Sequence, residues 1–171
     1  MKAISFQTDI LPLKNELFRM ALRITQNREE AEDVVQETMI KVWNRREQWS
    51  QLESIEAFCL TICRNLALDK LRRMDNQAQS LADDIDPTDL SHSSNPEQVT
   101  IQRDRSRMVR QLINELPERQ RTCMQLRDIE GKSYRDIAQI LDITEQQVKI
   151  NIFRARQAVK ERYLMIEKVR K

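Results

Sequence analysis

The sequence predicts an all-α protein, and three observations lead to that class. Its 171 residues contain one glycine, whereas hairpin-rich sheets and dinucleotide- or phosphate-binding loops need glycine at several fixed turns. Lys, Arg, Glu, Gln, Leu and Met, which favour helices, are abundant, and helix breakers are few. Apolar residues recur at steps of three and four along both halves of the chain, as they do on one face of a helix. The length suits one medium domain or two small ones.

Charge divides the chain into three parts. Residues 1–78 carry 12 basic and 12 acidic side chains, residues 79–100 carry five acids and no Lys or Arg, and residues 101–171 carry 17 basic and 10 acidic ones. The acidic stretch is rich in Ser and Asp and has no apolar period. We therefore expect a flexible acidic linker over residues 79–97 that leaves two domains, 1–78 and 98–171, free to reorient. The basic excess of the second domain indicates a nucleic-acid partner.

Three helices are expected in the first domain. Apolar spacing predicts one over residues 13–24, a second that follows an Asn27 cap, and a third over about residues 55–74. The polar segment 45–54 is predicted to be a loop. On the third helix, small and apolar side chains share one face: Cys59, Ile62, Cys63 and Leu66.

The second domain has the spacing of a helix-turn-helix. Pro117 suits the first turn of a helix that ends near Gly131. Ser133 with Asp136, and Thr144 with Gln147, are spaced as capping boxes before a short helix and a longer basic one. The longer helix, from about residue 145 to residue 159 or beyond, docks through Val148, Ile152, Ala155 and Val159. Its other face carries the residues that we expect to contact DNA: Gln146, Lys149, Ile150, Phe153, Arg154 and Arg156.

Other kinds of function are not indicated by the sequence. No stretch without a charged residue exceeds seven, whereas about 20 apolar residues span a bilayer, and residues 1–12 lack the features of a signal peptide. We expect a cytoplasmic protein with reduced cysteines and no membrane insertion. No nucleophile–base–acid set is present, so no catalytic residue, enzyme activity or cofactor is expected. Cys59 and Cys63 have only His92 and Cys123 to complete four ligands, so no metal site is expected.

Three stretches, in order, resemble one family. Residues 31–43, AEDVVQETMIKVW, closely resemble the core-polymerase-binding signature of bacterial sigma factors, and the extracytoplasmic-function (ECF) group matches best. Residues 64–73, RNLALDKLRR, resemble the promoter-melting and minus-ten helix of that group. Residues 116–156 resemble its minus-thirty-five domain. The sequence departs from the family pattern at Asp142, at Gln146-Gln147 and at Ile150-Asn151, so the resemblance does not specify the promoter sequence.

The resemblance implies the partners and the residues that meet them. The partners are core RNA polymerase, promoter DNA and an anti-sigma factor. Asp33, Gln36 and Glu37 would dock on the coiled coil of the largest polymerase subunit, and the second domain would sit on the flap of the second subunit. The minus-ten element would meet segment 45–56 and the third helix, at Arg64, Asn65, Asp69, Lys70, Arg72 and Arg73.

Two other classes of protein remain open at this stage. One is a stand-alone helix-turn-helix regulator whose first domain senses a ligand or dimerises, and the other is a helical adaptor with no DNA role. A sigma factor would co-purify with core polymerase and support run-off transcription, whereas a regulator would footprint DNA unaided.

Overall fold

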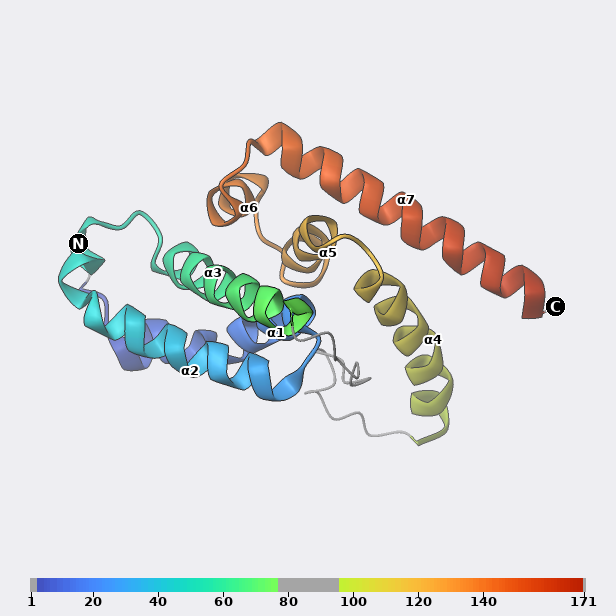
Figure 1. Ribbon diagram of the computed structural model, residues 1–171, viewed down its shortest axis with the longest axis horizontal. Helices are drawn as coiled ribbons and strands as arrows, with labels where there is room; N and C mark the ends of the chain where they lie inside the picture. Colours follow the sequence, from blue (N-terminus) through green and yellow to red (C-terminus); the bar gives the residue numbers. More distant parts are fainter. Residues whose placement is uncertain (1–2, 77–95, 171) are drawn as a thin grey trace.

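Every regular element in the described part of the chain is a helix, which confirms the predicted all-α class (Figure 1). The structure, a computed structural model, describes residues 3–76 and 96–170, so the predicted linker lies almost wholly outside it. In chain order the elements are η1 (Phe6–Ile10), η2 (Leu11–Leu13), α1 (Lys14–Thr25), α2 (Arg28–Asn44), η3 (Arg46–Gln51), α3 (Ile55–Asn76), α4 (Pro96–Asn114), α5 (Glu118–Met124), η4 (Gln125–Ile129), α6 (Tyr134–Leu141) and α7 (Glu145–Arg170).

The first three long helices, α1 to α3, pack together as the N-terminal module. Helix α1 ends at Thr25, and the next residue, Gln26, has a left-handed φ of 54°. Asn27 then caps α2 by accepting a hydrogen bond from the Glu30 amide at 3.0 Å. The predicted apolar face of α3, with Cys59 and Cys63, is buried in the module. Local sequence therefore sets both the helix boundaries and the buried faces.

The segment predicted to be a loop is instead a short 3₁₀ helix, η3. Trp49 lies within it, is buried, and donates its indole N–H to the carbonyl of Val42 at 3.1 Å. Its ring also meets that of Trp43 edge to face, with centroids 6.1 Å apart. Trp49 thus holds a polar segment against the end of α2. The prediction of a loop rested on the polarity of the segment and did not take this contact into account.

Helices α4 to α7 form the C-terminal module, and both predicted caps are present. Ser133 accepts from the Asp136 amide at 3.1 Å, and Thr144 and Gln147 exchange reciprocal hydrogen bonds at 3.1 and 3.0 Å. Gly131 has a φ of 73°, as expected of a glycine that ends a helix. Helix α7 has 26 residues, hence a length of about 39 Å, and its second half packs on α4.

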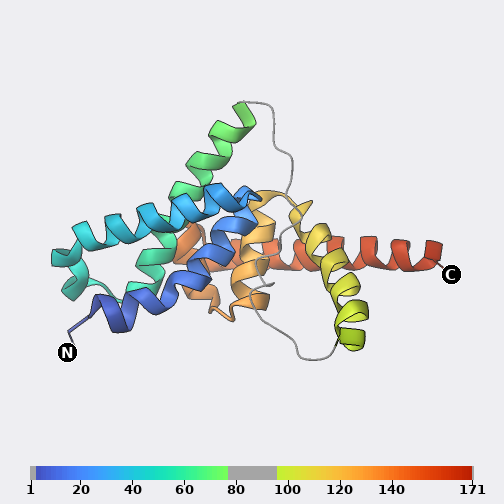
Figure 2. The same ribbon diagram turned by 90° about the horizontal axis from the view of Figure 1, so that it is seen from below.

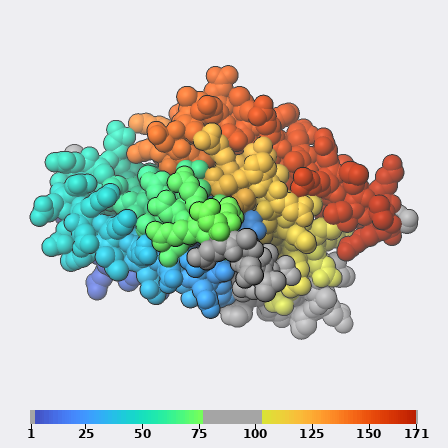
Figure 3. Space-filling view, in the orientation of Figure 1, coloured from blue at the N-terminus to red at the C-terminus, as the bar shows by residue number. Residues whose placement is uncertain are grey.

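The two modules pack directly on each other (Figures 2 and 3). Helix α5 lies against α1 and α6 lies against α3, and one apolar cluster continues from the N-terminal module into Cys123, Leu126, Ile137 and Ile140. The expectation that the two domains reorient freely does not match this arrangement. The apolar faces of α5 and α6 are buried against the N-terminal module. The composition of the linker, from which free movement was predicted, carries no information about that contact.

Candidate polymerase and DNA interfaces

One face of α2 presents the residues predicted to bind polymerase. Asp33, Gln36 and Glu37 are exposed, whereas Val34 and Thr38, on the other side of the helix, are buried. The structure therefore brings the three predicted residues together on one surface.

Two apolar residues that the sequence prediction missed continue this surface. Ile40 is 60% exposed and Trp43 is 46% exposed, at steps of three from Glu37, so helical spacing could have identified them. Trp43 is held edge to face by Phe6, with ring centroids 5.7 Å apart, and the guanidinium of Arg46 stacks 4.7 Å from its ring. The α2 face is thus acidic at its start and apolar at its end, a combination suited to docking a protein.

An ion pair joins the α2 face to the predicted minus-ten helix. The Lys70 Nζ of α3 lies 3.5 Å from the Glu30 carboxylate and 3.9 Å from that of Glu37. Glu37 is a predicted polymerase contact and Lys70 a predicted DNA contact, so the two candidate surfaces meet along the α2–α3 seam.

Most of the predicted minus-ten residues on α3 are accessible. Asn65, Asp69, Arg72 and Arg73 are exposed, and Arg72 lies 3.7 Å from Asp69 one helical turn before it. Exposed cations along one helix are suited to phosphate contacts, which carry affinity without sequence information.

Arg64 differs from the other predicted minus-ten residues because it is buried. Its side chain shares the helix face of Leu60 and Ala67, which are also buried, and only 7% of the residue is exposed. A guanidinium nitrogen of Arg64 donates to Glu118 of α5 at 3.1 Å, so its partner belongs to the other module. In this arrangement Arg64 cannot touch DNA.

The predicted reading face of α7 is intact and open to solvent. Val148, Ile152, Ala155 and Val159 are buried, and the opposite side carries the expected exposed set of Gln146, Lys149, Ile150, Phe153, Arg154 and Arg156. Ile150 is 42% exposed and Phe153 63% exposed. Apolar tips flanked by cations are suited to a major groove, where thymine methyls and phosphates lie close together.

Asp128, at the end of η4, pairs with one cation of this reading face. Arg156 donates through Nε to Asp128 Oδ2 at 3.0 Å and through a terminal nitrogen to Oδ1. The hydrogen bond to Asp128 raises the pKa of Arg156 above its ordinary value. Asp128 lies 28 residues before Arg156, so no local pattern in the sequence identifies the pair.

Tyr134, the first residue of α6, joins the two helices of the helix-turn-helix. The Arg127 guanidinium lies 4.2 Å and the Lys149 ammonium 5.5 Å from the centre of its ring. Contacts of this kind with an aromatic ring fix the direction of long side chains. Tyr134 therefore helps to position Lys149 on the reading face.

Within residues 3–76 and 96–170, no three His, Cys, Asp or Glu side chains are grouped as a metal site would require. No helix in that part of the chain is both long and apolar enough to cross a membrane. Cys59, Cys63 and Cys123 are free and buried, and burial raises the pKa of each thiol to about 12.

Comparison with known families identifies both modules. The model of sigma-70 region 2 matches residues 10–77, and that of sigma-70 region 4 matches residues 106–159. The ECF RNA polymerase sigma-E factor of Haemophilus influenzae is 33% identical over 144 residues, which cover 80% of this chain and 76% of the relative. The chain belongs to the ECF sigma factors.

Further relatives and one solved structure are similar to this sigma factor. The RNA polymerase sigma-H factor of Pseudomonas aeruginosa is 28% identical, over 91% of this chain and 84% of its own. SigE of Mycolicibacterium smegmatis is 32% identical over 86% of this chain, which spans 57% of that relative. RpoE in complex with the anti-sigma factor NepR, from Bartonella quintana, has the same fold. It superposes with a TM-score of 0.73 at 22% identity, over 91% of this chain and 94% of its own.

Proposed function

We propose that this sigma factor binds core RNA polymerase, directs it to specific promoters and assists melting of the promoter DNA. The observation that carries the proposal is the presence of sigma-70 regions 2 and 4, in order, on one chain. The exposed α2 face and the exposed reading face of α7 supply one surface for the enzyme and one for the DNA. The polymerase supplies the chemistry, and the protein supplies only binding.

Each predicted surface then has a role in initiation. The α2 face around Asp33, Gln36 and Glu37 docks on the polymerase, and Ile40 and Trp43 extend that contact. The exposed cations of α3 hold the minus-ten phosphates, while α7 reads the minus-thirty-five element. Melting removes a base from the stack at a cost of a few kcal/mol, and segment 45–56 beside α3 is where we infer that the base is captured.

We further infer that an anti-sigma factor regulates this chain and that it works in the cytoplasm, where core polymerase and DNA are found. The relatives support the first inference, because RpoE was solved with the anti-sigma factor NepR, and CnrH with the cytosolic domain of CnrY. CnrH superposes with a TM-score of 0.65 at 18% identity, over 91% of this chain and 85% of its own.

Run-off transcription with purified core polymerase on a promoter library tests the proposal. Core polymerase alone should initiate on none of the templates, and core polymerase with this protein should initiate on a defined subset. The protein should also co-purify with the polymerase subunits. A stand-alone regulator would instead give a sequence-specific footprint without polymerase and would leave core polymerase inactive. That result would overturn the proposal.

A further inference from the structure

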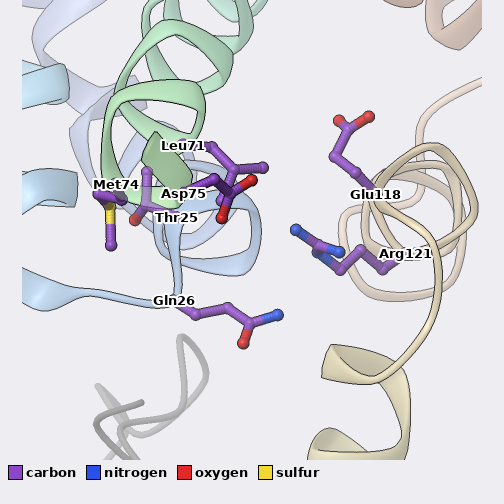
Figure 4. A pocket seen from close by; sticks show the side chains of 7 residues that line it. All are labelled: Thr25, Gln26, Leu71, Met74, Asp75, Glu118 and Arg121. Carbon is purple, nitrogen blue, oxygen red and sulfur yellow. The ribbon is translucent and has the colours of Figure 1, made fainter. Parts of the chain in front are cut away.

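The two ends of the packed pair α2 and α3 differ in how fully their side chains are engaged. Where α2 begins and α3 ends, the pair borders a cavity of about 290 Å³, into which Arg121 and Glu118 reach from α5 (Figure 4). Both are engaged within the chain, because Arg121 donates to three backbone carbonyls and Glu118 accepts from two side chains. Where α2 ends and α3 begins, Trp43 is instead left nearly half exposed.

Three side chains hold the ring of Trp43 in one orientation. The Phe6 ring meets it edge to face, with centroids 5.7 Å apart and ring planes at 83°, and the Trp49 ring meets it at 6.1 Å and 66°. The guanidinium of Arg46 lies 4.7 Å from the centre of the ring, and the same side chain donates to the Trp43 carbonyl at 3.2 Å. Aromatic pairs and cation–π contacts are directional, so together they restrict rotation of the Trp43 side chain.

The segment that carries Phe6 is itself fixed. Two hydrogen bonds of 2.8 Å close η1, from the Ser5 amide to the Asp9 carboxylate and from the Asp9 amide to the Ser5 carbonyl. Ile10, after Phe6, is completely buried, and Ile4, before it, packs against the same apolar core. Phe6 therefore lies between two anchored points, and its ring is a rigid support.

An exposed aromatic ring that is fixed in advance is suited to bind another protein. Association normally costs the conformational entropy of each side chain that becomes immobile, and a side chain that is already immobile avoids that cost. Tryptophan is also among the residues that most often dominate the affinity of an interface, from apolar pockets of the partner. Trp43 has both properties, since it combines a large exposed area with a restricted ring.

The position of Trp43 on α2 favours the polymerase over DNA as its partner. Steps of three lead from Glu37 through Ile40 to Trp43, so the ring continues the predicted polymerase surface. Asp33 and Glu37, exposed on the same face, would repel the phosphates of a DNA strand. Glu37 lies about 9 Å along the helix from Trp43. The partner surface that fits is thus an apolar pocket with basic groups about that far away.

We propose that Phe6 is a positioning residue for polymerase binding, which holds Trp43 so that its exposed side enters an apolar pocket of core polymerase. The inference rests on the proposed function, because it deepens the same polymerase surface. The model of sigma-70 region 2 begins to match at residue 10, so Phe6 lies outside the part of the chain that this family model covers.

Four substitutions in the full chain separate positioning from packing. Phe6→Ala removes the support, Phe6→Leu keeps apolar contact with the core but lacks the ring, and Phe6→Tyr restores the ring. Phe18→Ala is the matched control. Phe18 also packs partly buried against the same core, but its ring lies 5.7 Å from the guanidinium of Arg28, at the opposite end of α2 from Trp43.

The motion of the Trp43 ring and the affinity for core polymerase are measured separately. Time-resolved fluorescence anisotropy follows ring motion, and acrylamide quenching assigns the signal, because Trp49, the other of the two tryptophans, is buried. Biolayer interferometry without DNA gives the affinity. Phe6→Ala and Phe6→Leu should free the ring and weaken core binding by about threefold to tenfold. Phe6→Tyr should match the wild type in both measurements.

The control and a double variant complete the experiment. Phe18→Ala should lower the melting temperature, as Phe6→Ala does, but leave ring motion and core affinity unchanged. Trp43→Ala should weaken core binding by roughly tenfold or more. Adding Phe6→Ala to Trp43→Ala should cause no further loss, because no ring remains to be positioned.

Several outcomes would overturn the inference. A freed ring with unchanged core affinity would show that the orientation of Trp43 does not matter for binding. Weaker binding with unchanged ring motion, or a further loss in the Trp43→Ala background, would show that Phe6 acts by another route. Unchanged core affinity in Trp43→Ala, with impaired promoter opening, would assign the ring to DNA. Failure of the wild-type protein to bind core polymerase would instead overturn the proposed function.

Discussion

Arg156 of α7 donates two hydrogen bonds to Asp128, so one cation of the proposed DNA-reading face is already bound to a carboxylate. The Nε–Oδ2 distance is 3.0 Å, and the pair links η4 to the recognition helix. A phosphate that binds Arg156 must replace Asp128 or share the guanidinium with it. Under the proposed function, we therefore expect Asp128 to limit how much Arg156 contributes to DNA affinity.

Asp128→Asn should strengthen binding to minus-thirty-five DNA by roughly threefold to tenfold and steepen its dependence on salt by about one released counterion, because it frees Arg156 for phosphate. Fluorescence anisotropy across a range of salt concentrations measures both values. Glu115→Gln is the control, because it disrupts the Arg162 pair in the same module without touching the reading face. An unchanged salt slope would show that Arg156 does not meet phosphate.

Asp33→Lys and Glu37→Lys should weaken binding to core polymerase at least tenfold without unfolding the protein. Both residues are exposed on α2, where substitutions change stability by under about 0.5 kcal/mol. Surface plasmon resonance against core polymerase gives the affinity, and thermal melting checks the fold. Glu161→Lys on α7 makes the same change of charge and should leave core binding unaltered. An equal loss of affinity for core polymerase in all three variants would show that the net charge of the protein, and not a docking face on α2, is responsible.

Phe153→Ala and Arg154→Ala should change transcription from a set of minus-thirty-five variants in different ways. Arg154→Ala should lower transcription from all minus-thirty-five variants by a similar factor, because a phosphate contact carries no sequence information. Phe153→Ala should flatten the ranking among variants that differ in thymine content, at about 1 kcal/mol for each lost methyl contact. Both are run with core polymerase on one promoter set. A uniform loss with Phe153→Ala would place its ring outside the groove.

Thr144→Ala should lower the free energy of unfolding by about 1 kcal/mol, because the reciprocal hydrogen bonds with Gln147 cap the recognition helix. Urea denaturation measures the loss. Thr144→Ser keeps the hydroxyl and should retain most of the stability. If both substitutions cost the same, the methyl group rather than the cap would be responsible.

A protease site placed between residues 79 and 95 should be cut readily, because that stretch carries acids without cations and has no apolar period. We expect the two fragments to stay together after the cut, because α5 and α6 share an apolar cluster with the N-terminal module. Size-exclusion chromatography of the cut protein at micromolar concentration measures this. Separate elution of two folded fragments would show that the modules are held only by the linker.

Local features of the fold were predictable from the sequence, and contacts between distant segments were not. The caps at Asn27, Ser133 and Thr144 and the buried stripe of α7 depend on residues three or four positions apart, which the sequence displays directly. The predicted exposure of Ile150 and Phe153 is confirmed for the same reason. Trp49 was the exception among local features, since its indole N–H reaches back seven residues to Val42 and orders a polar segment.

The partners of Arg64 and Arg156 could not be read from helical spacing. Glu118 lies 54 residues from Arg64 and Asp128 lies 28 residues from Arg156, and only the packed helices bring each carboxylate to its cation. The sequence marks both arginines as exposed cations on basic helices. Whether such a cation is free for DNA depends on tertiary packing, which one sequence does not show.

Arg19 of α1 donates two hydrogen bonds to the Glu130 carboxylate, 111 residues further along the chain, and that separation has a consequence during synthesis on the ribosome. Helices α1 and α3 emerge first, and their docking face stays uncovered until α6 has been made, at residue 141. At about 5–20 residues per second, the chain between the end of α3 and the end of α6 takes roughly 3–13 s to synthesise. We therefore expect the uncovered side of α1 and α3 to be the surface through which nascent chains aggregate in that interval.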